Sequence, residues 1–330
     1  MKLGLKTQIL PAGPAATAAA ARILGQGGLV AFPTETVYGL GADASNAAAI
    51  AHLYQAKCRP AFNPLIAHVS DLTAARRIAR FDSVATRLAE AFWPGPLTLV
   101  LPKTENCPVA DLATAGLDTV AIRIPAHAIA REILWAFGRA VVAPSANLSG
   151  HVSPTTAEHV LGDLEGRIDL IVDGGAVNVG VESTIIGCFD APMLLRPGGL
   201  PRAEIERVLE RPLTRPPADA ESDSGQPLAP GMLASHYAPR TQVRLNAENL
   251  APGEALLAFG PHAPAGIDAA AAVMNLSARG DLDEAAANLF GYLRALDARG
   301  ARAIAVMPIP HEGLGEAIND RLRRAAVGRE

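Results

Sequence analysis

Lysine and cysteine are scarce in this chain, and both shortages limit what the protein can be. Lysine accounts for only four of the 29 basic residues, and the net charge of −4 with a pI near 6.1 leaves no overall basic field for holding nucleic acid nonspecifically. The three cysteines, Cys58, Cys107 and Cys188, are odd in number and form no C-x-x-C pair. This spacing argues against a zinc ribbon and against a secreted disulfide framework, and it favours a reducing cytoplasm.

Long apolar runs are also missing. No stretch approaches the roughly 18 consecutive apolar residues of a membrane span, and the N-terminal residues carry two lysines without a long apolar core. We therefore expect a protein that is neither exported nor embedded in a membrane. With 330 residues and 49% apolar content, the chain can bury a large core and is long enough for two domains. These values are typical of a soluble enzyme.

Short apolar runs alternate with helical patterns between residues 14 and 209, which is typical of an α/β layer architecture. The predicted strands cover 29–32, 65–69, 97–101, 120–124, 140–143, 170–172, 184–187 and 193–195. The predicted helices cover 15–26, 46–57, 72–79, 84–91 and 128–137, and Pro201 opens another as a first-turn proline. The last two strands are separated by too little chain for a crossover helix, so we predict a mixed parallel and antiparallel sheet.

A proline-rich stretch divides the chain. Residues 211–230 contain five prolines among small and acidic residues and show no periodicity, so they are predicted to form a linker. Strands are predicted again at 242–245, 255–259, 272–276 and 303–308, with helices at 282–299 and 314–326. We therefore divide the chain into a larger first domain (1–209), a linker (210–240) and a small α/β C-terminal domain (241–330).

Polar residues follow the first predicted strand in the segment 32–41, with the sequence FPTETVYGLG. A strand end that runs into hydroxyl groups, a carboxylate and glycines is a usual ligand position in open α/β sheets. A polar turn stabilised by threonine side chains explains the same pattern equally well. Glu35 in this segment is interpreted as either a helix-capping residue or a member of an ion pair.

Two further segments carry groups suited to a polyanion: KCRP at 57–60, with Asn63 behind it, and PSAN at 144–147. Phosphate oxygens accept hydrogen bonds from cations, hydroxyls and amides of this kind. Because lysine is so rare here, Lys57 suggests that a compact point charge is required. In an extended chain, Lys57 and Arg59 would point the same way and could meet one polyanion. For this pair alone, a solvated helix end is the favoured alternative.

Arg123 and His68 lie within predicted strands. Arg123 is flanked by isoleucines in TVAIRIP (119–125), so its guanidinium is expected to be buried, which is costly unless it meets a carboxylate of the protein or of a substrate. His68 follows three apolar residues and is either a core histidine or a ligand contact. Small and hydroxylic residues from 143 to 154 permit close approach of a phosphate or sugar, although an ordinary loop has the same composition.

The order and wording of these segments are more specific than any one of them. FPTETVYGLG, K-x-R-P, NPL at 63–65, PSAN, and VEST at 181–184 together resemble the YrdC/Sua5 family of threonylcarbamoyl-AMP synthases. The resemblance covers the chain from about residue 15 onward, and GMLASHYAP at 231–239 makes it similar to the long Sua5 type. One departure is Ala229, where the linker motif commonly has serine. The resemblance implies a YrdC-like twisted mixed sheet with flanking helices and a smaller, Rossmann-like α/β C-terminal domain.

The resemblance also implies an activity. The family makes threonylcarbamoyl-adenylate from L-threonine, bicarbonate or CO2, and ATP, releasing pyrophosphate, as a nucleotidyltransferase step toward N6-threonylcarbamoyladenosine at position 37 of tRNA. The nucleophile is the carbamate formed on the threonine amine, so no Ser-His or Cys-His pair is required. Catalysis would then come from positioning and from cations, helped by Mg2+ bound with ATP, without an organic prosthetic group or a metal site made of protein side chains.

The resemblance assigns site residues position by position. The implied catalytic residues are Lys57, Arg59, Ser145 and Asn147. The implied ATP contacts are Lys57, Arg59, Asn63, Thr119, Ser145, Asn147, Ser153, Arg196 and Tyr237. The implied threonine contacts are Thr36, His68, Arg123, the backbone at Ala143, and Ser183. Arg123 is suited to clamp the threonine carboxylate with two hydrogen bonds, and a flexible linker ending in Tyr237 could close over the nucleotide as a lid.

Two other functions stay open at this point. A double-stranded RNA or tRNA-binding module is one, because the fold of this family presents a concave basic surface, but the acidic net charge leaves weak RNA binding as a secondary expectation. A carbamoyl-transfer or hydrogenase-maturation protein is the other, and the missing C-x-x-C pair argues against its zinc-finger architecture. The expected partners are the three substrates and the downstream tRNA threonylcarbamoyltransferase machinery, in the cytoplasm and away from membranes.

Overall fold

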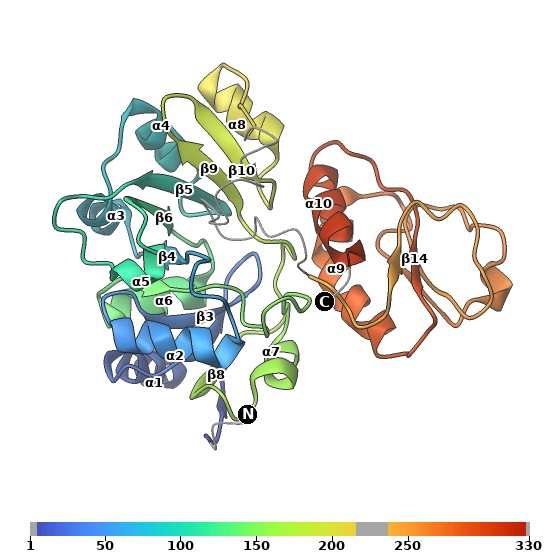
Figure 1. Cartoon of the computed structure of the whole chain (residues 1–330), viewed down its shortest axis with the longest axis horizontal. Helices are drawn as coiled ribbons and strands as arrows, with labels where there is room; N and C mark the ends of the chain where they lie inside the picture. The colour runs from blue at the N-terminus through green and yellow to red at the C-terminus, as the bar shows by residue number, and fades with distance from the viewer. Residues whose placement is uncertain (1–4, 216–236, 328–330) are drawn as a thin grey trace.

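A sheet of ten strands organises the first domain in this computed structural model, which describes residues 5–215 and 237–327 (Figure 1). The strands lie in the order β1-β8-β2-β3-β7-β4-β6-β5-β9-β10. Their bounds are β1 Gln8–Pro11, β2 Val30–Pro33, β3 Tyr38–Asp43, β4 Ile66–His68, β5 Leu97–Pro102, β6 Thr119–Arg123, β7 Val141–Val142, β8 Leu170–Asp173, β9 Thr184–Cys188 and β10 Pro192–Arg196. Parallel pairs such as β4–β6 and antiparallel pairs such as β9–β10 both occur, so the predicted mixed sheet is confirmed.

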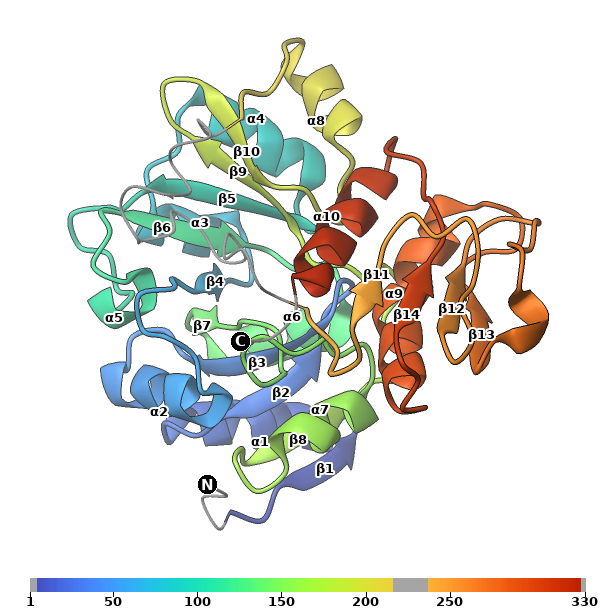
Figure 2. The ribbon, with the colours of Figure 1, turned by 45° about the vertical axis from the view of Figure 1, so that its right-hand side comes forward.

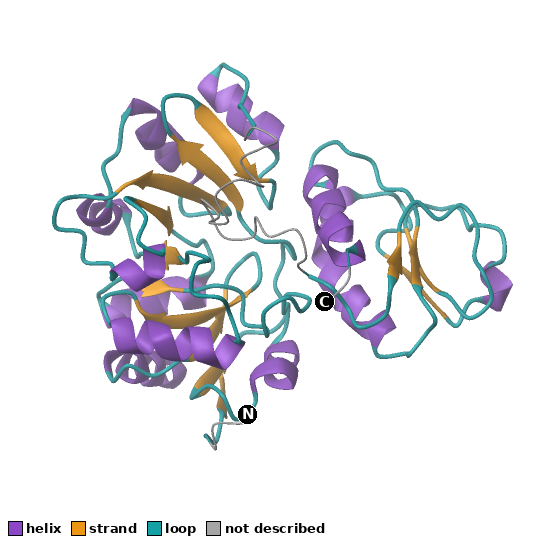
Figure 3. Cartoon of the chain, viewed as in Figure 1, coloured by secondary structure: helices purple, strands orange, loops and turns teal. Residues whose placement is uncertain are grey.

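Helices cover both faces of this sheet (Figure 3). They are α1 Pro14–Gly25, α2 Ala47–Lys57, α3 Leu72–Ile78, α4 Ser83–Phe92, α5 Asp111–Thr114, α6 Ala128–Phe137, α7 Ala157–Leu164 and α8 Arg202–Leu209. Within β2, Val30 and Phe32 pack with α1 and α6, whereas Ala31 belongs to the larger cluster that α2, α3 and α4 cover. Side chains alternate across a strand, so one short segment contributes to two cores.

The sequence patterns do not predict β1, β3, α5 or α7. β3 contains Gly39 and Gly41, and glycines weaken the apolar pattern of a strand. The glycine at 41 is required, because a Cβ atom there would lie 2.8 Å from the Phe32 ring and 2.9 Å from Val141 Cγ1. β1 is an exposed edge strand of four residues and α5 is a four-residue turn, so both are too short to show a period.

A second, smaller sheet forms the C-terminal domain. Its four strands are parallel in the order β11-β14-β12-β13, in the part of the chain that the structure describes. The elements are β11 Val243–Arg244, β12 Ala255–Ala258, η2 Ile267–Ala269, β13 Ala272–Asn275, α9 Leu282–Asp297, β14 Ile304–Val306 and α10 Gly315–Ala326. An all-parallel sheet in which helix α9 crosses over from β13 to β14 agrees with the expected Rossmann-like unit.

The two domains share a packed interface. α9 and α10 lie on the side of the C-terminal domain that faces the first domain, and α10 lies near β9 and β10 (Figure 2). Val152 and Val181 of the first domain belong to the same apolar cluster as Phe290 of α9. Gly180 has φ +77°, and a Cβ atom there would lie 2.3 Å from the carbonyl oxygen of Ala286. Only glycine therefore permits this close approach to α9.

Most of the predicted linker, and the predicted lid apart from Tyr237, lies outside the described residues. The first linker residues that are described extend the large sheet, because Thr214 donates to the Pro192 carbonyl and accepts from the Leu194 amide at the edge of β10. The domain boundaries stay a prediction. None of the helices described here is long and apolar enough to cross a bilayer.

Candidate functional site

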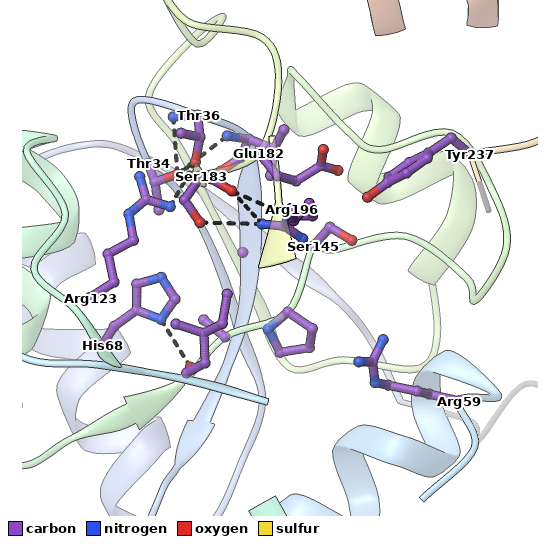
Figure 4. A pocket seen from close by; sticks show the side chains of 15 residues that line it. Thr34, Thr36, Arg59, His68, Arg123, Ser145, Glu182, Ser183, Arg196 and Tyr237 are labelled. Carbon is purple, nitrogen blue, oxygen red and sulfur yellow. Dashed lines mark hydrogen bonds between the residues drawn. The ribbon is translucent and has the colours of Figure 1, made fainter. Parts of the chain in front are cut away.

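A pocket opens where the loops after β2 and β7 and the segment just before β9 meet the ends of β4, β6 and β10. The space between its walls is about 570 Å³, with the open mouth included. Its lining residues are Thr34, Thr36, Val37, Gly39, Arg59, Ile66, His68, Arg123, Ala143, Pro144, Ser145, Glu182, Ser183, Arg196 and Tyr237. Figure 4 shows Arg123, His68 and Thr36 at one side and Arg59 and Tyr237 at the other, with Arg196 and Ser145 between them.

Arg123 is buried, as its isoleucine neighbours predict, and its partner is a carboxylate of the protein. Its Nη2 donates to Glu35 Oε1 at 2.6 Å, its Nη1 to Thr36 Oγ1 at 2.9 Å and its Nε to the Gly95 carbonyl at 3.2 Å. Burial raises the pKa of Glu35, but the charge of Arg123 outweighs it, so the net pKa is lowered. A guanidinium has five N–H groups, and these three bonds leave up to two for a ligand. Glu35 is thus the ion-pair member, not a helix cap.

His68 is both a buried histidine and part of the pocket wall. β4 and β6 are parallel and in register, so His68 pairs with Arg123 and both side chains project from the same side of the sheet. His68 Nδ1 lies 3.2 Å from the Ile66 carbonyl, which only accepts, so Nδ1 carries the proton and Nε2 is an acceptor. Burial, together with the nearby charge of Arg123, lowers the pKa of His68 to about 3. The ring is therefore neutral at physiological pH.

Ser183 lies in the middle of the pocket and is held from two sides. Its hydroxyl lies 2.8 Å from Thr98 Oγ1, and Arg196 Nη2 donates to its carbonyl at 2.8 Å and contacts its hydroxyl at 3.2 Å. Thr34 and Thr36 form a comparable pair, with their hydroxyl oxygens 2.8 Å apart. These hydroxyls stabilise a turn, as one interpretation of the FPTETVYGLG segment predicts, and they also line the pocket; ligand binding by this segment stays a prediction.

Arg59 lies at the opposite end and has no carboxylate within ion-pair distance among the described residues. Its Nη2 donates to the Pro64 carbonyl at 3.1 Å, and its Nε is buried without a hydrogen-bond partner. Burial, reinforced by the charge of Arg196, lowers the pKa of Arg59 to about 10, so the side chain is still a cation. A half-buried cation without a carboxylate partner is suited to an anionic ligand.

Lys57 occupies a different position from the one expected. Its side chain is 1% exposed and does not line the pocket; its ammonium donates to the backbone carbonyls of Ser145 and Asn147. The expected parallel direction of Lys57 and Arg59 is wrong, because Cys58 ends α2 in the left-handed conformation (φ 52°) and the segment is not extended. Burial, and after it the charge of Arg59, lowers the pKa of Lys57. The rare lysine here braces the PSAN loop.

Four other predicted nucleotide contacts also lie away from the pocket wall. Asn147 donates through Nδ2 to the carbonyls of Leu148 and His151, and Ser153 donates to Glu182. Asn63 is buried, and its Oδ1 has no hydrogen-bond partner. Thr119 lies at the start of β6, so four residues of strand, or about 13 Å, separate it from Arg123. Their roles toward ATP stay predictions.

The structure adds residues to the predicted set. Glu182 lies within the VEST segment, one residue before Ser183, yet its pattern alone gives no sign that the carboxylate faces the pocket. Gly39 and Pro144 complete the wall, and a Cβ atom on Gly39 would lie 3.2 Å from Ala143 Cβ. Apolar Val37 and Ile66 show no chemical signal in the sequence. Within the described ranges, no group of three His, Cys, Asp or Glu side chains is placed to hold a metal ion.

Two family models together match most of the chain. One, described as telomere recombination and grouping Sua5, YciO and YrdC, matches residues 22–198; the other, described as the C-terminal domain of threonylcarbamoyl-AMP synthase, matches residues 200–327. The threonylcarbamoyl-AMP synthase of Pyrococcus abyssi is 44% identical over 93% of this chain and 93% of its own length. That of Bacillus subtilis is 41% identical over 94% of this chain and 93% of its own length.

Solved structures show the same similarity. The crystal structure of P. abyssi Sua5 complexed with L-threonine matches with a TM-score of 0.87 at 39% identity, covering 98% of this chain and 97% of that chain. E. coli YciO, at 24% identity and a TM-score of 0.54, covers 59% of this chain and 96% of its own, and shares the fold of the first domain.

Proposed function

This chain belongs to the YrdC/Sua5 family of threonylcarbamoyl-AMP synthases, enzymes of the nucleotidyltransferase type, and we propose that it joins L-threonine, bicarbonate or CO2, and ATP into threonylcarbamoyl-adenylate with release of pyrophosphate. The observation that carries the proposal is a single pocket with two chemically different ends. Arg123, His68 and Thr36 form one end, and the uncompensated Arg59 forms the other. The product would serve N6-threonylcarbamoyladenosine formation in tRNA.

The Arg123 end is suited to threonine. Up to two N–H groups of Arg123 are available for the α-carboxylate, and Glu35 keeps the guanidinium oriented. His68 Nε2 is an acceptor for the substrate ammonium or hydroxyl group, and Ser183 supplies a further hydroxyl. The P. abyssi relative was solved with L-threonine, which supports the same substrate here.

The Arg59 end is suited to the triphosphate group of a nucleotide. Arg59 and Arg196 are cations that line the pocket, and Ser145 adds a hydroxyl to the same wall. In the reaction, the threonine amine attacks CO2 and loses a proton, giving a carbamate. A carbamate oxygen then forms a bond to the α-phosphorus while the bond to the pyrophosphate oxygen breaks. The two arginines stabilise the charge that grows on the phosphate oxygens and on pyrophosphate.

This scheme requires no protein nucleophile, because the attacking oxygen belongs to the substrate. His68 holds its single proton on Nδ1 toward Ile66 and is oriented as an acceptor. Lys57 contributes by holding the carbonyls of Ser145 and Asn147, which fixes the loop that carries the Ser145 hydroxyl. Orientation of the three substrates is thus the main contribution of this chain.

Mg2+ fits the donor set as a companion of ATP. Glu182 is the carboxylate that lines the pocket in the described residues, and both its oxygens are already bonded, to Ser153 and to Arg321. The metal would therefore be held by phosphate oxygens, where it would neutralise charge on the leaving group. Action in the cytoplasm, transfer of the product to a tRNA-modifying transferase, and weak RNA binding belong to the same proposal.

The test is pyrophosphate release by the full chain with MgATP, L-threonine and bicarbonate, omitting each in turn. The proposal expects release only when all three are present, and threonylcarbamoyl-adenylate as the second product. Release that ignored threonine would contradict it. Tight binding of tRNA without any ATP turnover would favour the RNA-binding module instead.

A further inference from the structure

We propose that Arg321, in helix α10 of the C-terminal domain, is a positioning residue for the nucleotide end of the pocket and acts through Glu182 and Tyr237. The inference rests on the proposed function and extends it to a residue of the other domain. The motif segments of the first domain do not contain this residue, and the proposal gives the C-terminal domain a defined part in ATP binding.

Arg321 is fully buried where the two domains meet. Its side chain is 0% exposed, although a helix surface usually presents the charged end of an arginine to water. Its Nε donates to Glu182 Oε2 at 2.7 Å and its Nη2 to the Pro197 carbonyl at 3.0 Å, both in the first domain. Its Nη1 donates to Asp320 Oδ2 of its own helix at 2.5 Å. The three nitrogen atoms of the planar guanidinium therefore each donate to a different acceptor, two in the first domain and one in the C-terminal domain.

The first target of Arg321 is a carboxylate that faces the pocket. Glu182 is 7% exposed, lines the pocket and accepts a hydrogen bond from Ser153 on its other oxygen. A buried carboxylate beside a triphosphate repels it unless a cation compensates the charge. Arg321 supplies that cation in direct contact, and its hydrogen bond to one carboxylate oxygen, together with the bond from Ser153 to the other, fixes the orientation of Glu182.

The second target is the tyrosine that lines the same end. The Arg321 guanidinium carbon lies 5.1 Å from the centroid of the Tyr237 ring, within cation–π distance. The ring also stacks on Phe290 of α9, with centroids 5.5 Å apart and planes inclined by 24°. Tyr237 has φ 63°, which a non-glycine residue adopts only when its surroundings hold it. Two helices of the C-terminal domain therefore set the place of a pocket residue.

An alternative role for Arg321 is simple adhesion between the domains, and the chain offers a matched control for it. Arg202 of α8 donates to Glu316 of α10 through Nε at 3.1 Å and through Nη2, so this pair crosses the same interface. Neither Arg202 nor Glu316 lines the pocket. A residue that only joins the domains should behave like Arg202, whereas a positioning residue should change the use of ATP.

The experiment uses the full chain with Arg321→Met, Arg202→Met, Glu182→Gln and the Arg321→Met/Glu182→Gln double variant, and measures the KM for ATP and for threonine. Arg321→Met is expected to raise the KM for ATP on the order of tenfold or more, because it leaves a buried negative charge beside the phosphates. The KM for threonine should change by less than about twofold, since Arg123 lies at the other end. In the double variant, the neutral amide that replaces the Glu182 carboxylate removes the repulsion, so part of the lost ATP affinity should return.

Arg202→Met should leave both KM values at the level of the unmodified chain. The positioning role is wrong if Arg321→Met folds and its KM for ATP is unchanged, or if its KM values for ATP and threonine rise together. It is also wrong if the double variant with Glu182→Gln recovers none of the lost affinity for ATP. If Arg321→Met does not fold, Arg321→Gln decides, because it removes the charge but keeps an N–H donor for Glu182: a raised KM for ATP supports the role and a normal one overturns it. Turnover by the unmodified chain tests the proposed function separately from these ratios.

Discussion

Replacing Arg123 with lysine tests the threonine end of the pocket most directly. The guanidinium reaches three separate acceptors, on Glu35, Thr36 and Gly95, and still has up to two N–H groups for a ligand. A lysine ammonium has three N–H groups on one atom and cannot meet the same acceptors and a carboxylate together. Lysine keeps the positive charge beside Glu35, so the variant mainly removes the directed hydrogen bonds of the guanidinium.

The expected increase in the KM for threonine follows from the loss of one charge-assisted hydrogen bond. Such a hydrogen bond contributes about 1.5–3 kcal/mol. At about 1.4 kcal/mol for each factor of ten, its loss raises the KM for threonine about 10- to 100-fold. The turnover number should fall less, because the α-carboxylate does not take part in the bond changes at phosphorus. The KM for ATP should stay within about twofold, because ATP binds at the Arg59 end.

The assay is pyrophosphate release with threonine varied at saturating MgATP and bicarbonate, and then with ATP varied at saturating threonine. Arg87→Lys is the control, since Arg87 pairs with Glu210 at the surface, where both side chains are well exposed, and such a pair contributes well under about 1 kcal/mol. An unchanged KM for threonine in a folded Arg123→Lys variant would refute the assignment. An equal rise in both KM values would show instead that the whole pocket had been distorted.

Three further predictions concern stability and protonation. In a urea titration, Lys57→Ala should lower the free energy of unfolding by about 2–3 kcal/mol, because the Ser145 and Asn147 carbonyls lose the lysine as a donor. Arg59→Ala should have little effect on the free energy of unfolding but should remove ATP-dependent turnover. Burial raises the pKa of Asp163, but hydrogen bonds from His151 and Arg294 outweigh burial and lower the pKa to about 2. The ionised carboxylate therefore stabilises the fold at pH values above its ordinary pKa of 3.8, and this stability, about 2 kcal/mol, is lost as the pH falls toward 2. The Asp163→Asn variant should lose less stability between pH 6 and pH 3 than the unmodified chain. With its pKa lowered to about 3, His68 should show no titration in imidazole NMR around pH 6–7, and a titration there would contradict its burial beside Arg123.

The sequence determined the features that depend on neighbours along the chain. Periodic apolar residues predict most strands and helices within one or two residues, because a face that must be buried repeats with the geometry of its element. Caps such as Asn46 and Asp71 mark helix starts for a similarly local reason, since they accept from N–H groups two or three residues away. The short connection between β9 and β10 requires an antiparallel pair. The order of the motif segments was enough to indicate the family.

Tertiary structure alone decided which charges meet. Glu35 lies 88 residues from Arg123, and Arg321 lies 139 residues from Glu182, so no spacing in the sequence reports either contact. Lys57 is the last residue of α2 and is buried, whereas the left-handed turn at Cys58 gives the following Arg59 a different direction, into the pocket. A cation inside the fold can hold a loop, pair with a carboxylate or be available to a ligand. Its role depends on which acceptors the folded chain brings within hydrogen-bond distance, and these are set by the packing of the fold.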